Sequence, residues 1–171
     1  KFEGEHLLPG QLGHFFVILA FIASLLATVS FFKASWETDL VEKNKWIQFG
    51  RTVFFIQVAS VVAIFATIFF ICSHHYYEYM YAYKHASKEL EPKYLLACIW
   101  EDQSGSFLLW SIWHCILGLI LIARSKEWEA PVMTIISAAQ VFLAMMIMGV
   151  YIFFDIKIGN SPFVLTRNEI N

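Results

Sequence analysis

The stretch LGHFFVILAFIASLLATVSFF, residues 12–32, contains no Asp, Glu, Lys or Arg over 21 consecutive positions. A helix needs about 20 mostly apolar residues to cross the hydrocarbon core of a bilayer, which is about 30 Å thick. Three later stretches have the same character, at residues 52–72, 106–123 and 132–154. Because lipid cannot satisfy unpaired backbone groups, these stretches predict an all-α integral membrane protein with four transmembrane helices.

Composition limits what else the chain can contain. Hydrophobic residues make up 58% of its 171 residues and charged residues only 15%, whereas a soluble domain carries about 25% charged residues. The four spans and their loops use nearly the whole length, so we expect a single transmembrane domain, residues 1–171, embedded in the lipid bilayer. The net charge is −2, and no run of Lys or Arg forms a basic patch. A nucleic-acid partner is therefore not expected.

The distribution of Lys and Arg predicts the orientation of the spans. Residues 33–51 and 124–130 carry six of these residues in 26 positions, while residues 1–11, 73–102 and 155–171 carry six in 58. Short cytoplasmic loops hold the excess of Lys and Arg. We therefore place the first and third loops in the cytoplasm, and both termini and the long middle loop outside.

The middle loop is rich in tyrosine, with six between positions 76 and 94. Tyrosine favours the membrane–water interface, so these residues are expected to contribute to an aromatic belt. Pro92 interrupts the chain, and the apolar run at residues 94–100 is too short to span the membrane. This run predicts a helix that lies in the interface.

Two patterns bear on packing inside the membrane. Small residues recur at every fourth position of the first two spans, which predicts close helix packing. They are Ala20, Ser24 and Thr28, and Ala59, Ala63 and Thr67. The cysteines are Cys72, Cys98 and Cys115, none of them in a CxxC pair. They fit either small packing residues or a Cys72–Cys98 disulfide.

Histidines inside the predicted spans are the candidates for chemistry, because ionisable residues in a membrane often serve a function. His14 lies in the first span and His114 in the third, and on facing helices they could bind a b-type haem. Each could instead hydrogen-bond a neighbouring helix or face the headgroups. No carboxylate lies within a span, and the sequence shows no recognised catalytic motif or metal-ligand spacing. This argues against an ion-coupled transporter.

The most specific stretch is WEDQSGSFLLW, residues 100–110. Gly105 permits a tight turn, and Ser106 can cap the third span. Trp100 and Trp110 flank the point where the chain enters the membrane. We expect these four residues to shape the outer start of the third helix.

This stretch resembles the W-G-x-x-E-G-S-x-L-L-W segment of the CcmF/CcsA-type cytochrome c maturation proteins, the membrane haem lyases. Three other segments agree in order. GQLGHF at residues 10–15 is similar to the family's opening G-H-F, EPKY at 91–94 to the segment before the motif, and NSPF at 160–163 to the S-N-P-F after the fourth span. Glu101 and Ser104 replace the family's Gly and Glu, and the sequence contains neither the W-W-D loop nor the H-P-P histidine.

The resemblance implies cytochrome c-type biogenesis in the bacterial inner membrane, with both termini periplasmic. The family attaches haem covalently to the cysteines of CxxCH in apocytochrome c. Without the W-W-D and H-P-P residues we expect no catalytic residue in this chain. It would serve as a scaffold portion of a larger or split haem lyase, through Trp100, Gly105, Ser106 and Trp110. Haem is then expected in the full complex, with the remaining portion of the lyase and apocytochrome c as partners, and not on this chain alone.

Two alternatives from other functional classes stay open. A b-haem electron-transfer subunit would use His14 and His114 as ligands and show a reversible haem spectrum in the isolated chain. A structural subunit of a membrane complex would purify without colour, and its deletion would leave cytochrome c levels unchanged.

The predicted orientation can be tested by cysteine labelling. A cysteine introduced near Lys88 should react with a membrane-impermeant maleimide added to intact cells, because this loop is expected outside. A cysteine near Lys43 should be protected until the membrane is permeabilised. The reverse labelling pattern would invert the topology.

Overall fold

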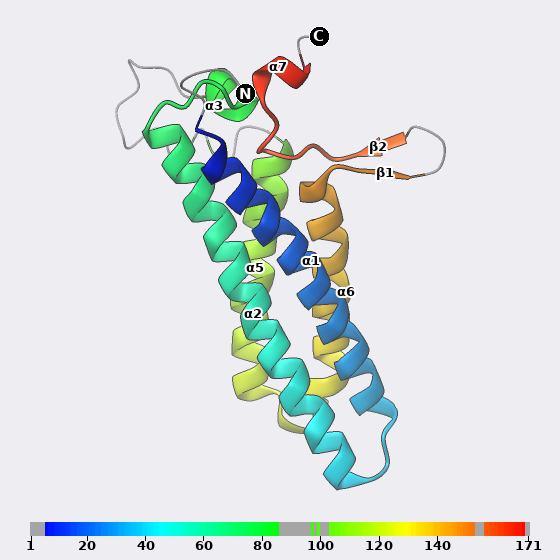
Figure 1. Ribbon diagram of the computed structural model, residues 1–171. Helices are drawn as coiled ribbons and strands as arrows, with labels where there is room; N and C mark the ends of the chain where they lie inside the picture. The colour runs from blue at the N-terminus through cyan, green and yellow to red at the C-terminus, as the bar shows by residue number, and fades with distance from the viewer. Residues whose placement is uncertain (1–5, 86–96, 98, 100–102, 153–155, 170–171) are drawn as a thin grey trace.

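The computed structural model describes residues 6–85, 97, 99, 103–152 and 156–169. Four of its helices are long and apolar enough to cross a membrane. They are α1 (Leu7–Trp36), α2 (Leu40–Ser73), α5 (Gln103–Arg124) and α6 (Glu129–Met148), the last preceded by the short 3-10 helix η1 (Lys126–Trp128). The smaller elements are α3 (Met80–His85), β1 (Val150–Ile152), β2 (Ile156–Ile158) and α7 (Thr166–Glu169) (Figure 1). The predicted all-α membrane architecture with four spans is confirmed.

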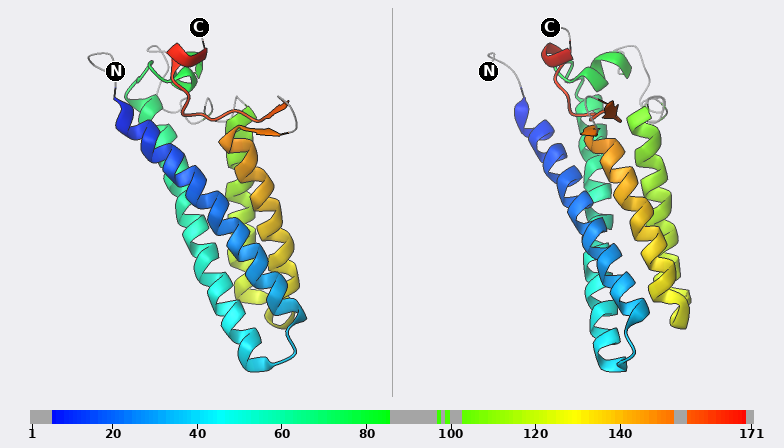
Figure 2. Two further views of the ribbon diagram at one scale, coloured as in Figure 1. Left: turned by 45° about the vertical axis from the view of Figure 1, so that its right-hand side comes forward. Right: turned by 90° about the vertical axis from the view of Figure 1, so that its right-hand side faces the viewer.

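The four long helices form an up-and-down bundle. Helix α1 packs against α2 and α6, and α5 packs against α6 and α2, so α1 and α5 occupy opposite corners (Figure 2). The start of α1, the end of α2, the start of α5 and the end of α6 lie together, beneath α3, α7 and the β1–β2 hairpin (Figure 1). We call this the capped end, and the opposite end the hairpin end. The α1–α2 hairpin extends beyond the α5–α6 hairpin there.

Small residues line the buried face of α1, as the sequence predicts. Its buried positions include Ala20, Ala23, Ser24, Ala27 and Ala34. Helices α1 and α2 pack against each other, as the small residues of the two spans predict. The small residues at positions 59, 63 and 67 of α2 are not buried in this contact. The buried face of α2 carries larger side chains, and these fill the space beside glycines on neighbouring helices: Phe54 lies over Gly118 of α5. The interior is thus built by matching a large side chain on one helix with a small one on the next.

The helix ends differ from the predicted spans in three places. The fourth span was predicted to reach residue 154, but α6 ends at Met148. Gly149 adopts the left-handed conformation (φ 70°, ψ 54°) and its N–H bonds to the Met145 carbonyl. Such a glycine terminates a helix. The chain then forms β1, whose Val150 pairs antiparallel with Ile158 of β2. These β-branched residues favour a strand.

The other two differences concern the loops. The predicted first loop, residues 33–51, is mostly helical, because α1 continues to Trp36 and α2 starts at Leu40. The Asp39 side chain caps α2 by accepting from the Val41 N–H at 3.1 Å. Helix α5 starts at Gln103, so Ser106 lies within its first turn rather than at the predicted cap. Only residues 97 and 99 of the expected interfacial helix are described, and Cys98, one end of the possible disulfide, is outside the described residues.

A partly buried ion pair joins α2 to α6 at the hairpin end. Arg51 donates two hydrogen bonds to the carboxylate of Glu129, at 2.6 and 2.5 Å. The Glu129 side chain is 3% exposed and that of Arg51 is 41% exposed. Glu129 is the first residue of α6, where the helix dipole also favours a negative charge. Both residues fall within predicted loops, at residues 33–51 and 124–130, and no sequence pattern links them.

A second polar link joins α5 to α6 halfway along the bundle. The Gln140 amide donates to the Ser111 carbonyl at 2.8 Å and to the Cys115 sulfur at 3.3 Å, and its oxygen accepts from the Ser111 hydroxyl at 2.5 Å. Gln140 is 1% exposed. Cys115 is therefore a buried hydrogen-bonded packing residue, in keeping with one of the two alternatives for the cysteines.

The Arg51–Glu129 pair should contribute measurably to stability. We expect Glu129→Gln to lower the free energy of unfolding by about 2 kcal/mol, between the values for surface and for buried ion pairs, because Arg51 is partly solvated. The matched control is Glu42→Gln, which breaks an exposed pair with Lys45 (2.7 Å) and should change stability by less than about 0.5 kcal/mol. Unfolding of the purified protein in mixed micelles would measure both. Equal effects would contradict a structural role for the partly buried pair.

Candidate functional site

Three segments that are far apart in the sequence meet at the capped end. Phe163, which is 2% exposed, packs directly over Gly13, where any side chain would overlap its ring. The edge of the same ring meets His14, with ring centroids 5.7 Å apart. Ser104 of α5 lines a small cavity of about 40 Å³ together with residues 160–162. Residues 10–14, 104–105 and 160–163 therefore form one continuous region.

Tyr79 lies at the centre of this region and is 1% exposed. Its hydroxyl donates to the His6 carbonyl at 2.6 Å and accepts from the Gly10 N–H at 2.9 Å. In a regular helix these two backbone groups would bond directly, because they are four residues apart. The tyrosine hydroxyl is thus inserted into the first turn of α1. Gly10 makes room for it, since a Cβ there would lie 2.5 Å from the tyrosine ring.

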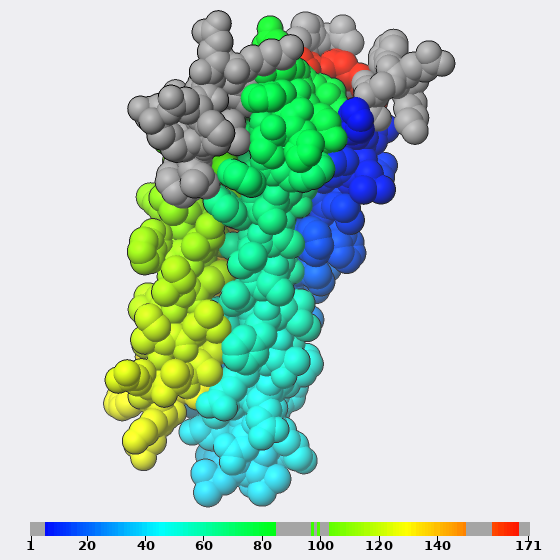
Figure 3. All heavy atoms as spheres, turned by 90° about the vertical axis from the view of Figure 1, so that its left-hand side faces the viewer, coloured from blue at the N-terminus to red at the C-terminus, as the bar shows by residue number. Residues whose placement is uncertain are grey.

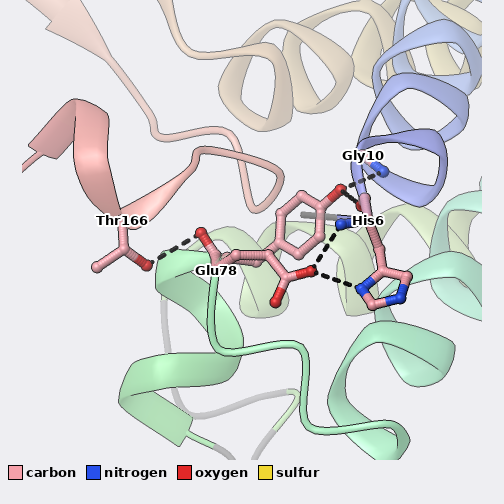
Figure 4. Close-up of polar contacts among 5 residues, drawn as sticks. His6, Gly10, Glu78 and Thr166 are labelled. Carbon is pink, nitrogen blue, oxygen red and sulfur yellow. Dashed lines mark hydrogen bonds and ion pairs between the residues drawn. The ribbon is translucent and has the colours of Figure 1, made fainter. Parts of the chain in front are cut away.

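The neighbouring Glu78 connects the start of α1 to the C-terminal segment (Figure 4). Its carboxylate accepts from the His6 backbone N–H at 3.0 Å and lies 3.1 Å from His6 Nδ1. Its backbone carbonyl accepts from the Thr166 N–H at 2.8 Å. Beside it, Met80 N–H donates to the Val164 carbonyl at 3.0 Å. These bonds hold the segment before α7 alongside the α2–α3 connection as a short strand-like pair.

Gly105 has a different role from the one expected. A tight turn was predicted at Gly105, but Gly105 is a helical residue in the first turn of α5. The described glycines with positive φ are Gly149 and Gly159 instead. The Ile99 carbonyl approaches so closely that a Cβ at position 105 would overlap it, and the Tyr81 hydroxyl would lie at 2.6 Å. Tyr81 also donates to that carbonyl. Gly105 is therefore required by close backbone approach.

A larger open cavity of about 300 Å³ lies beside α1 at the capped end. Its walls combine apolar side chains with polar ones from three segments. They are Leu7, Gly10, Gln11 and His14 of α1, Tyr79, residues 163–165, and Arg167 of α7. A basic and amide-bearing rim over an apolar wall suits an amphipathic ligand that carries an acidic group.

The structure does not bring the two candidate haem ligands together. His14 is exposed on α1 beside Phe163, and His114 is partly exposed on α5, with its Nδ1 2.8 Å from the Trp110 carbonyl. These two helices occupy opposite corners of the bundle, and neither histidine is among its buried residues. Among the described residues, no three His, Cys, Asp or Glu side chains gather as metal ligands.

The four residues predicted to shape the start of the third span do not all lie at the capped end. Gly105 and Ser106 belong to the capped end, in the first turn of α5. Trp110 lies on the outward face of α5 and is 57% exposed. Trp100 is outside the described residues. The individual roles of Tyr79 and Glu78 were not predicted. A tyrosine-rich stretch does not reveal which hydroxyl is buried against a distant helix.

Comparisons with protein-family models, with curated proteins and with solved structures find no match for this chain. The site is therefore interpreted from its own geometry and from the segments that carry the resemblance.

The inserted hydroxyl gives a stability prediction for the capped end. Tyr79→Phe should lower the free energy of unfolding by about 1–3 kcal/mol, because it leaves the buried Gly10 N–H and His6 carbonyl without this partner. Tyr83→Phe is the matched control, since Tyr83 is 62% exposed, and it should have little effect. Thermal unfolding of the purified proteins would compare them. If Tyr79→Phe matched the control, the hydroxyl would not fix the start of α1.

Proposed function

We propose that this chain is a membrane scaffold portion of a haem lyase, which supports covalent attachment of haem to apocytochrome c. One observation carries the proposal: the segments that resemble the family at residues 10–15 and 160–163 and at the start of α5 converge on the capped end. Topology places these segments at one end of the bundle, and their direct contact, such as that of Phe163 with Gly13, goes beyond what topology requires. Their convergence is what a shared recognition surface requires.

The same region has properties suited to that role. The 300 Å³ cavity joins apolar residues to His14, Gln11 and Arg167, and haem is an amphipathic molecule with acidic groups. In this proposal the capped end faces the periplasm of a bacterial inner membrane, where it meets apocytochrome c. The loop charges support this orientation, because Lys33, Arg51, Arg124 and Lys126 all lie toward the hairpin end.

The proposal assigns the covalent chemistry to the remaining portion of the lyase. This chain would position that portion and shape one wall of the shared site, with haem held in the full complex. The electron-transfer alternative gains no support from the separation of His14 and His114. The structural-subunit alternative predicts the opposite result in a deletion strain, which makes it distinguishable.

Complementation of a deletion strain tests the proposal. Deletion should abolish or strongly reduce covalently bound haem in c-type cytochromes, measured by in-gel haem peroxidase staining. His14→Ala should restore maturation poorly, because it alters the cavity wall at an exposed position. Gly105→Val should do the same by displacing the Ile99 backbone.

The control for these variants is Ile18→Ala, one turn further along the exposed face of α1, and it should restore maturation fully. Immunoblots of the membrane fraction separate loss of function from loss of protein. Unchanged cytochrome c in the deletion strain would reject the proposal and favour a structural subunit.

A further inference from the structure

The outward face of α5 carries polar groups at the middle of the membrane. Helix α5 has 22 residues, which rise about 33 Å and so match the hydrocarbon core. Trp113 and His114 therefore lie near its centre. Trp113 is 61% exposed and His114 is partly exposed. Helix α5 forms one edge of the face shown in Figure 3. Tryptophan is usually found at the interface rather than at this depth.

The hydrogen bond of His114 fixes which of its nitrogens is free to bind. Nδ1 lies 2.8 Å from the Trp110 carbonyl, and a carbonyl oxygen can only accept. Nδ1 is therefore the protonated nitrogen of the neutral ring, and Nε2 carries the lone pair. The indole N–H of Trp113 is a donor that needs an acceptor. Among the described residues, neither group has a partner.

This polar face differs from the other outward surfaces. The exposed side chains of α1 in its apolar middle are hydrocarbon, for example Ile18, Ile22 and Leu25, and lipid covers them at no cost. Lipid tails cannot satisfy the indole N–H or the imidazole lone pair, and an unpaired polar group in hydrocarbon is costly. The α5 face therefore requires a protein or cofactor partner.

The spacing of the exposed residues matches a helix-pairing seam. Trp110, Trp113, Leu117 and Ile120 are separated by three, four and three positions, and each is at least 45% exposed. This is the a/d repeat with which two helices interdigitate. In a parallel pair, Trp113 enters the hole formed by positions 110, 113, 114 and 117 of the facing helix. Its indole N–H then meets the imidazole Nε2 of His114 in that helix.

We propose that a second copy of this chain covers the α5 face, with reciprocal Trp113–His114 hydrogen bonds across a twofold axis along the membrane normal. The face supplies both the donor and the acceptor at one depth, so it is complementary to itself, as a twofold interface must be. The inference goes beyond the proposed function and does not depend on it.

Disulfide trapping in native membranes tests the pairing. Cys72, Cys98 and Cys115 are replaced by Ala in the full chain, and Ile120→Cys is introduced in the seam. Phe142→Cys, on α6 and 65% exposed, is the control. Oxidation should give a dimer with Ile120→Cys and not with Phe142→Cys. A monomer with both, or Ile120→Cys linked only to a different polypeptide, would overturn the proposal.

A double-mutant cycle tests the hydrogen bonds themselves in the otherwise native chain. Trp113→Phe and His114→Leu should each weaken dimerisation in lipid about tenfold, since either one removes both reciprocal bonds. The double variant should be no weaker than a single one, because the two residues act as a pair. Additive losses would overturn the proposal. A haem absorption band that disappears in His114→Leu would also overturn it, by assigning Nε2 to iron.

Discussion

The hydroxyl of Tyr79 lies between two backbone groups of α1, and the arrangement of the capped end depends on that insertion. Tyr79 belongs to the connection that follows α2, and the same connection pairs with the segment before α7. One side chain therefore fixes the start of α1 relative to both the end of α2 and the C-terminal segment. Phe163 can pack over Gly13 only because that segment is held in place. The cavity beside α1 is a consequence of these contacts.

Polar contacts elsewhere in the bundle determine which helices are neighbours. Lipid tails are as apolar as the helix surfaces, so the hydrophobic effect does not select one pairing over another. The Arg51–Glu129 pair joins α2 to α6 at the hairpin end, and Gln140 joins α6 to α5 at mid-depth. Between these links, glycines and alanines on one helix receive larger side chains from the next. The bundle is therefore specified by a few polar bonds together with complementary side-chain sizes.

The number and approximate position of the spans could be read from the sequence, because a 20-residue uncharged stretch has few soluble alternatives. The ends could not. Residues 149–152 are as apolar as the span before them, and only Gly149 marks the change from helix to strand. The roles of the residues at the capped end were harder to predict than the helix ends. The role of Gly105 comes from the Ile99 carbonyl, and that of Tyr79 from a helix about 70 positions away, so neither follows from local pattern.

The two histidines show why depth alone does not define a cofactor site. Counting residues from the capped end places His14 about 10 Å and His114 about 16 Å along their helices, which makes a shared haem conceivable. The position of each residue around its helix also matters: His14 is exposed on α1 and His114 is partly exposed on α5, at opposite corners of the bundle. Neither His14 nor His114 is among the buried residues of the bundle. His14 borders the open cavity beside α1, whereas His114 belongs to a different helix at the other corner of the bundle, so similar depth does not place them at one site.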